Sequence, residues 1–346
     1  MRINQMRTRH AAVLPEFCQD WNLQIDPSSP PIKRWVEVNL GRMLSTVLSD
    51  RPTQIRQGQR PLPYSLFDRL IGKALSPNYL LWQDPRMTPF DPCDLRVGDK
   101  SLPEAYHGEN FPDFLYKALL QLREGLGCIR LKGVPQTIAG MDCVYLTGGN
   151  SAAESVRARL SDFPIPILFA QDGVFGGERG GLAMLETLNR RGFVIDLGET
   201  QLKVAGGGGR QTYKRDTGFL PKAWQVPSRQ YPEQRQRLRH FISTNVAQFM
   251  AQTRERPGAV VIALPTGFTS MGIPGGSSYA GMEGDVTLIP DVLRQVGLTN
   301  IPVILVMGVT LAGVSAMLDS RTRNFRRLLL VSLGTDLATA LVLRPE

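Results

Sequence analysis

Cysteine and histidine are scarce in this sequence, and long apolar runs are missing. The four cysteines, at positions 18, 93, 128 and 143, are widely spaced with no Cys-x-x-Cys pair, which excludes a disulfide-built scaffold. Three histidines are too few to favour a zinc site. No apolar run reaches the roughly 18 residues that a membrane-spanning helix needs, and the opening residues lack the apolar core of a signal peptide. These absences predict a cytoplasmic protein with no membrane span.

The composition is that of a folded protein with more than one hydrophobic core. The chain has 346 residues, of which 42% are hydrophobic and 21% charged. Its net charge of +9 attracts phosphorylated partners in general. The densest basic stretches, 235–239 and 321–327, do not alternate with aromatic residues as single-strand grooves do. We therefore disfavour nucleic acid as a partner and interpret these stretches as solvated helix faces.

Hydrophobic periodicity predicts an α/β protein from residue 111 onward. A first unit has helices and strands in alternation, and a second has three strands before its first helix, the order expected of one mixed sheet. Residues 83–110 are rich in Pro, Asp and Gly and are predicted to be loop. The expected helices are 111–124, 151–160, 180–189, 231–253, 286–296 and 309–318, and the expected strands are 143–146, 166–170, 193–196, 201–204, 211–214, 259–264, 302–306, 328–333 and 338–343.

One strand ends in a motif that favours phosphate binding, Asp196-x-Gly198-x-Thr200-x-x-Lys203. A tight hairpin lets backbone N–H groups and a hydroxyl approach phosphates, while an Asp at the strand end orients water bound to Mg²⁺. The segment resembles the first phosphate motif of the superfamily that joins sugar kinases, actin and the heat-shock ATPases. The resemblance implies that Asp196 serves Mg²⁺ and that Gly198, Thr200 and Lys203 contact ATP.

Two further segments resemble motifs of the same superfamily. Val331-Ser-Leu-Gly334-Thr335 is similar to its second phosphate motif, and Val144-Tyr-Leu-Thr-Gly148-Gly149 is similar to its adenosine motif. The resemblance implies nucleotide contacts from Gly334 and Thr335, and from Gly148 and Gly149. Three coincidental glycine turns in an ordinary α/β protein are the alternative.

The order of these motifs differs from that of the family. There the two phosphate motifs precede the adenosine motif, whereas here the adenosine-like segment comes first. A circular permutation explains the order, because chains tolerate new ends where the old ones lie close and exposed. The resemblance thus implies a permuted, two-lobed actin-like (ribonuclease H-like) α/β fold with Mg-ATP in its cleft. The adenosine-side lobe would be 1–190, completed by 325–346, and the phosphate-1 lobe 191–324.

The family's general base is missing. Sugar kinases of this type place an Asp just after the strand that matches 302–306, where this chain has Gly308. Nearby loop acids offer replacements, and Asp285 is our candidate base, with Glu283 as a candidate substrate contact and Asp336 as a third acid. Each of the three is also a plausible turn or cap residue.

The resemblance to carbohydrate kinases of the hexokinase, ROK or FGGY type implies an ATP-dependent phosphotransferase acting on a sugar or polyol hydroxyl. A catalytically silent nucleotide- or sugar-binding regulator is the alternative, favoured by Gly308. A chaperone-like ATPase is a third possibility. Residues 1–75 would either form a homodimer surface or cover the lobe.

Overall fold

The computed structural model describes residues 79–81, 87–90, 95–108, 110–123, 128–131, 134–137, 140–171, 176–187, 190–266, 274–285, 287–299, 301–335 and 337–343. The expectations for residues 1–75 and for Asp336 lie outside these ranges. None of the helices within them is both long and apolar enough to cross a membrane.

The described residues divide into two compact units. The first comprises 79–81 and 182–308, and the second comprises 87–181 and 309–343. Two of the divisions fall inside helices, α7 (Gly176–Thr187) and α10 (Gly308–Leu318). The boundaries expected from the sequence, near 190 and 324, would place residues 79–81, 182–190 and 309–324 in the other unit.

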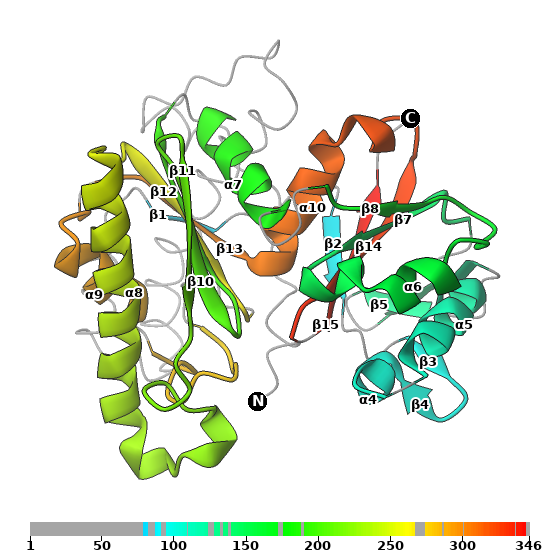
Figure 1. The fold of residues 1–346 in the computed structure, drawn as a ribbon, viewed down its shortest axis with the longest axis horizontal. Helices are drawn as coiled ribbons and strands as arrows, with labels where there is room; N and C mark the ends of the chain where they lie inside the picture. The colour runs from blue at the N-terminus through cyan, green and yellow to red at the C-terminus, as the bar shows by residue number, and fades with distance from the viewer. Residues whose placement is uncertain are drawn as a thin grey trace, which may run out of the picture. The chain divides into compact units, whose positions relative to one another are not determined.

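The first unit contains one mixed six-stranded sheet in the order β1-β13-β12-β9-β10-β11 (Figure 1). Strands β9, β10 and β11 form an antiparallel meander, while β12, β13 and β1 run parallel to β9. The central parallel strands are buried on both faces, which explains their continuous apolar sequences. The bounds are β1 Tyr79–Leu81, β9 Gly192–Leu197, β10 Gln201–Gly206, β11 Gly209–Lys214, β12 Ala259–Leu264 and β13 Val303–Met307.

Helices α8 (Tyr231–Thr253) and α9 (Leu288–Gln295) cover one face of this sheet (Figure 1). Their apolar side chains pack against alternate residues of the strands, including Ile195 and Leu197 of β9. Because side chains alternate along a strand, Asp196 lies on the opposite face of the sheet. The local pattern of β9 therefore turns the predicted metal-binding carboxylate away from the main core.

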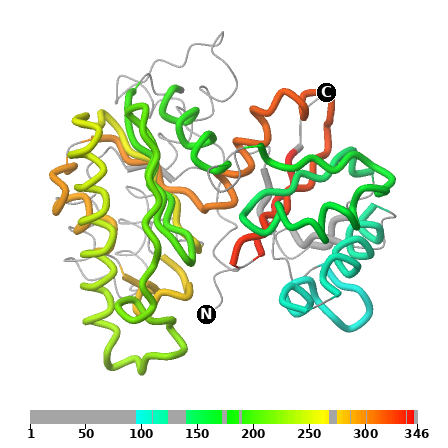
Figure 2. Tube along the Cα trace, in the orientation of Figure 1, coloured from blue at the N-terminus to red at the C-terminus, as the bar shows by residue number. Residues whose placement is uncertain are grey.

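The second unit contains a five-stranded sheet in the order β2-β15-β14-β7-β8. The C-terminal strands β14 and β15, red in Figure 2, pair with each other, and β14 runs parallel to the sequence-distant β7. Helices α4, α5 and α6 pack on one face through a core of leucines and aromatic residues. The bounds are β2 Met87–Phe90, β7 Cys143–Thr147, β8 Ile167–Phe169, β14 Arg327–Leu333, β15 Leu337–Leu343, α4 Leu102–Tyr106, α5 Phe111–Arg123 and α6 Glu154–Arg159.

The two sheets repeat one strand order. In the first unit β11-β10-β9-β12-β13, and in the second β2-β15-β14-β7-β8, three strands that pair antiparallel are followed by two strands that run parallel to the third. The third strand begins a hairpin in each unit and is followed directly by a glycine, Gly198 after β9 and Gly334 after β14. Each unit thus presents an equivalent hairpin turn.

The expectation of loop for residues 83–110 is wrong in part. This stretch contains β2, α4 and the short strands β3 (Arg96–Val97) and β4 (Lys100–Ser101). A second missed hairpin joins β5 (Cys128–Leu131) to β6 (Val134–Thr137). Elements of two to five residues are too short for hydrophobic periodicity to reveal them. The α/β class itself is confirmed.

Candidate functional site

The hairpin of β9 and β10 brings two predicted site residues together. Asp196 and Lys203 are direct partners in the antiparallel register, so their side chains emerge on the same face. Lys203 Nζ lies 2.8 Å from Asp196 Oδ2, and the side chains are 15% and 11% exposed. A positive and a negative group are thus fixed side by side at the end of a buried strand.

This pair lies at the edge where the parallel strands end. Asp196 is the penultimate residue of β9, β12 ends at Leu264, and Gly308 follows β13 as the first residue of α10. A Cβ atom on Gly308 would lie 3.7 Å from Asp196 Oδ1 and 3.9 Å from the Leu264 carbonyl oxygen. The carboxyl ends of parallel strands are where open α/β sheets bind ligands. The start of α10 beside Asp196 also favours negative charge there.

The residues at this edge fit a magnesium-bound nucleotide better than a metal ion held by protein alone. Among the described residues, no cluster of three or more His, Cys, Asp or Glu side chains could hold a metal. Mg²⁺ bound together with phosphates needs only one or two carboxylates, because water and phosphate oxygens complete its shell. Asp196 can provide that carboxylate, and Lys203 carries a charge that phosphate attracts.

The turn between β9 and β10 is fixed by donors to three consecutive carbonyl groups. The Tyr279 hydroxyl donates to the Gly198 carbonyl at 2.7 Å. Arg215 donates through Nη1 to the Glu199 carbonyl at 3.0 Å and through its backbone N–H to the Thr200 carbonyl at 2.8 Å. The Thr200 side chain is exposed, so it stands at the surface of a turn held from behind.

Arg215 is the centre of this network. Its side chain is 1% exposed, and its guanidinium also donates to the carbonyl groups of Leu220 and Pro221 and to Ser278. The guanidinium carbon lies 3.9 Å from the centre of the Tyr279 ring. Burial lowers the pKa of Arg215, and the nearby Tyr279 and Glu199 oppose that shift. The buried charge is therefore compensated by several carbonyl acceptors together with the Glu199 carboxylate, whose Oε2 lies 3.8 Å from Arg215 Nη1.

In the second unit the structure brings three of the predicted glycines together. Gly148 has φ +89°, and a Cβ atom there would lie 2.5 Å from the Leu333 carbonyl oxygen, so only glycine fits. Gly149 begins the short helix η4 (Gly149–Ala152). Asn150 of that helix donates to the Gly334 carbonyl at 2.9 Å, and the Tyr106 hydroxyl donates to the same oxygen. Thr335 follows at the turn, half-buried.

Asp285 occupies a different environment from the open loop that we expected. It is 4% exposed, and both carboxylate oxygens accept from Arg239 Nη2 at 2.6 and 2.7 Å. Arg239 belongs to α8 and also pairs with Asp291 of α9 at 3.1 Å. Asp285 thus belongs to a cluster of ion pairs in which Arg239 links α8 to α9, which favours a structural role. Glu283 is exposed, and its backbone carbonyl accepts from Arg235 at 3.2 Å.

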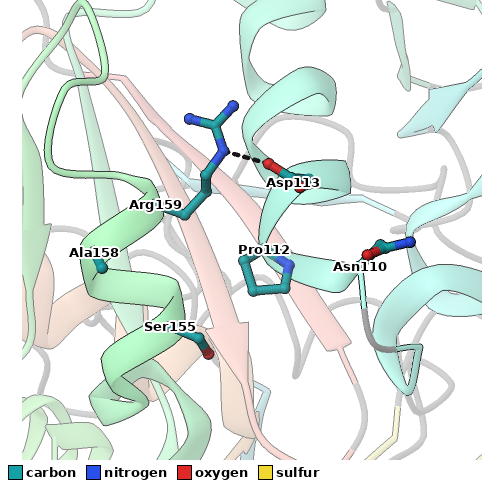
Figure 3. A pocket seen from close by; sticks show the side chains of 6 residues that line it. All are labelled: Asn110, Pro112, Asp113, Ser155, Ala158 and Arg159. Atoms are coloured by element: carbon teal, nitrogen blue, oxygen red, sulfur yellow. Dashed lines mark hydrogen bonds and ion pairs between the residues drawn. The ribbon is translucent and has the colours of Figure 1, made fainter.

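A surface hollow of about 420 Å³ lies between α5 and α6 in the second unit (Figure 3). Its walls include Asp113 and Arg159, which form an ion pair, and the Arg159 guanidinium lies over the Tyr116 ring at 3.7 Å. None of the residues predicted from the sequence lines this hollow. The hollow therefore does not belong to the candidate site.

Sequence reasoning missed four residues that shape the two turns. They are Arg215 and Tyr279 in the first unit, and Tyr106 and Asn150 in the second. Tyr279 lies in segment 279–285, where only the acids Glu283 and Asp285 were predicted as site residues. Tyr106 lies in the stretch expected to be loop. No local pattern reveals such residues, because their partners are distant in the chain.

Comparisons of the chain with protein-family models, with curated proteins and with solved structures return no match. The geometry of the two turns therefore carries the functional argument.

Proposed function

We propose that this protein binds Mg-ATP and transfers a phosphoryl group to the hydroxyl of a sugar or polyol. The observation that carries the proposal is the β9–β10 hairpin, whose turn and Asp196–Lys203 pair lie at the carboxyl edge of a parallel sheet. Turns of this kind bind anions through backbone N–H groups. Phosphoryl transfer depends mainly on positioning and charge neutralisation, which such an edge can supply.

The repeated strand order supports an actin-like fold. Proteins of that superfamily contain the same ribonuclease H-like sheet twice, and both units of this chain have a sheet of one common order. The order of the motifs along the chain, adenosine-like segment first, supports a circularly permuted version. We propose this fold as the frame of the site.

The residues of the three predicted motifs each have a proposed part in nucleotide binding. Asp196 would orient water bound to Mg²⁺, and Gly198, Thr200 and Lys203 would contact phosphate. In the second unit, the predicted nucleotide contacts are Gly148, Gly149, Gly334 and Thr335.

A nucleotide-binding regulator without transferase activity is the second candidate. Position 308 lies within van der Waals reach of Asp196, yet glycine provides no group that could take a proton from an attacking hydroxyl. Asp285, the replacement expected from the sequence, is engaged with Arg239. These two observations favour slow or absent transfer.

Calorimetric titration of Mg-ATP separates the candidates. The wild type is compared with Asp196→Asn, which keeps the side-chain shape, and with Asp162→Asn as a control on the exposed surface of the second unit. We expect Asp196→Asn to weaken binding at least about tenfold and the control to bind like wild type. ADP release that requires a sugar or polyol supports the transferase, and binding without release supports the regulator. No binding by the wild type overturns both.

A further inference from the structure

Two tyrosine hydroxyls make the same contact in the two units. Tyr279 donates to the carbonyl of Gly198, and Tyr106 donates to the carbonyl of Gly334. The two glycines occupy equivalent places, directly after the first strand of the hairpins β9–β10 and β14–β15. The tyrosines, however, come from unrelated segments. Tyr106 ends the short helix α4, whereas Tyr279 lies between β12 and α9. A contact built twice from different parts of the chain indicates a shared requirement of the turns.

The contact determines which way the turn's N–H groups point. A trans peptide is planar, so the N–H of one residue points opposite to the carbonyl of the residue before it. The carbonyls of Gly198 and Glu199 point toward Tyr279 and Arg215. The N–H groups of Glu199 and Thr200 therefore point to the other side of the turn. Successive N–H groups that face one side form a concave anion site.

The Tyr279 ring is itself held firmly. Its side chain is 2% exposed and lies against the buried Arg215 guanidinium. The neighbouring Ser278 donates through its backbone N–H at 3.3 Å, and through its hydroxyl, to the Glu199 carboxylate. Burial raises the pKa of Tyr279, so its hydroxyl stays protonated and able to donate at neutral pH. Hydrogen bonds from Ser278 and Tyr279 thus connect this segment to the turn.

From this geometry we infer that Tyr279 is a positioning residue for phosphate: its hydroxyl, on a ring that packs against Arg215, orients the turn at 198–200 so that the Glu199 and Thr200 N–H groups face the ligand. Tyr106 has the same part at the Gly334 turn. The inference rests on the proposed function, since it assigns the turn a phosphate ligand. It adds a residue that contacts no substrate and acts through the backbone of the turn.

The test uses Tyr279→Phe in the full chain, which removes a single oxygen atom and keeps the ring. Tyr213→Phe is a matched control, because the Tyr213 hydroxyl on β11 is buried and has no hydrogen-bond partner among the described residues. Calorimetry measures the Kd for Mg-ATP and for adenosine. We expect the Kd for Mg-ATP to rise about three- to tenfold in Tyr279→Phe, the effect of one hydrogen bond. Its Kd for adenosine, which has no phosphate, stays within about twofold.

A second measurement follows the protection of the turn's amide groups in the absence of nucleotide. Amide hydrogen exchange at residues 198–202 should be faster in Tyr279→Phe than in wild type and unchanged in Tyr213→Phe. Equal Mg-ATP binding by wild type and Tyr279→Phe, or equal exchange at the turn, overturns the positioning role and leaves the proposed function standing. Equal weakening of Mg-ATP and adenosine also overturns it, because that indicates a general structural loss. Failure of the wild type to bind Mg-ATP overturns the proposed function itself.

Discussion

Single backbone positions decide whether the turns can form. Gly148 has φ +89° and ψ 163°, a region that side chains other than glycine do not adopt, and it lies against the end of β14. We expect Gly148→Ala to lower the free energy of unfolding by about 2–4 kcal/mol, combining backbone strain with the clash at Leu333. Chemical denaturation measures the loss.

The neighbouring glycine provides the control for that substitution. A Cβ atom on Gly149 would meet no atom within 4 Å, and its φ is not positive. Gly149→Ala should therefore change stability by less than about 1 kcal/mol. Similar losses for both variants would show that flexibility, rather than the close approach to Leu333, is what position 148 requires.

Substitutions at Gly308 test whether a carboxylate at this position can act as a general base. A side chain fits there, because the nearest atom to an added Cβ is Asp196 Oδ1 at 3.7 Å. If the protein is a transferase limited by proton removal, Gly308→Asp should raise its rate by about 10²–10⁴-fold, the usual contribution of a general base. Gly308→Asn has the same shape without the charge and should not. A coupled assay for ADP release with a panel of sugars measures both, and equal rates in the two variants would exclude residue 308 as the place of the base.

Tyr145 makes the free energy of unfolding depend on pH under alkaline conditions. Burial and the nearby Asp319 carboxylate raise the pKa of Tyr145 to about 12, from an ordinary value of 10.0. The folded state thus holds the phenol proton more tightly, and this stabilisation is complete below pH 10 and is lost as the pH rises from 10 to 12. We expect the free energy of unfolding to fall in that window by up to about 1.4 kcal/mol per pH unit more in wild type than in Tyr145→Phe. Urea denaturation measures both proteins across this pH range. The same pH dependence of the free energy of unfolding in wild type and Tyr145→Phe would contradict the prediction.

At the scale of elements, local pattern predicts long segments well and short ones poorly. The expected helix 231–253 coincides with α8, which has Pro232 in its first turn and a left-handed Arg254 after its end. The continuous apolar run of β12 also matches its prediction. Strand β2 could not be predicted, because its four residues are defined by pairing with β15, which is distant in the chain. Short elements depend on tertiary partners rather than on propensity.

The pair of helices α8 and α9 depends on Asp285. Removing its carboxylate leaves Arg239, which is 12% exposed, with Asp291 as its remaining acidic partner. We expect Asp285→Ala to lower the free energy of unfolding by about 3 kcal/mol, the cost of breaking a buried ion pair. Asp291→Ala, at a more exposed partner of the same arginine, should cost about 1 kcal/mol. Loss of phosphotransfer at unchanged stability would instead restore Asp285 as the catalytic base.

At the scale of the whole molecule, the sequence places the candidate site residues of one hairpin together, but not the distant hydrogen-bond donors that hold the turns. Asp196 and Lys203 are seven residues apart in one hairpin, so local pattern suffices to place them together. Tyr279 and Gly198 are 81 residues apart, and nothing local links them. The same holds for Tyr106 and the Gly334 turn. Side chains within one hairpin can therefore be placed together from a motif, whereas the donors that orient the backbone are determined by the assembled fold.

Each unit has a hydrophobic cluster of its own among the described residues, which predicts that the chain does not unfold as one cooperative body. Leu305 belongs to the core of the first unit and Leu119 to that of the second, and both are fully buried. Leu305→Ala and Leu119→Ala should each lower the stability of its own unit by about 2–5 kcal/mol. Hydrogen exchange measured by mass spectrometry across a urea series follows both units in one sample. We expect each substitution to shift the exchange transition of its own unit and to leave the other within about 0.5 kcal/mol, because distant sites act additively. If either substitution moves both transitions together, the units are coupled in folding, and the two sheets must be treated as one thermodynamic unit.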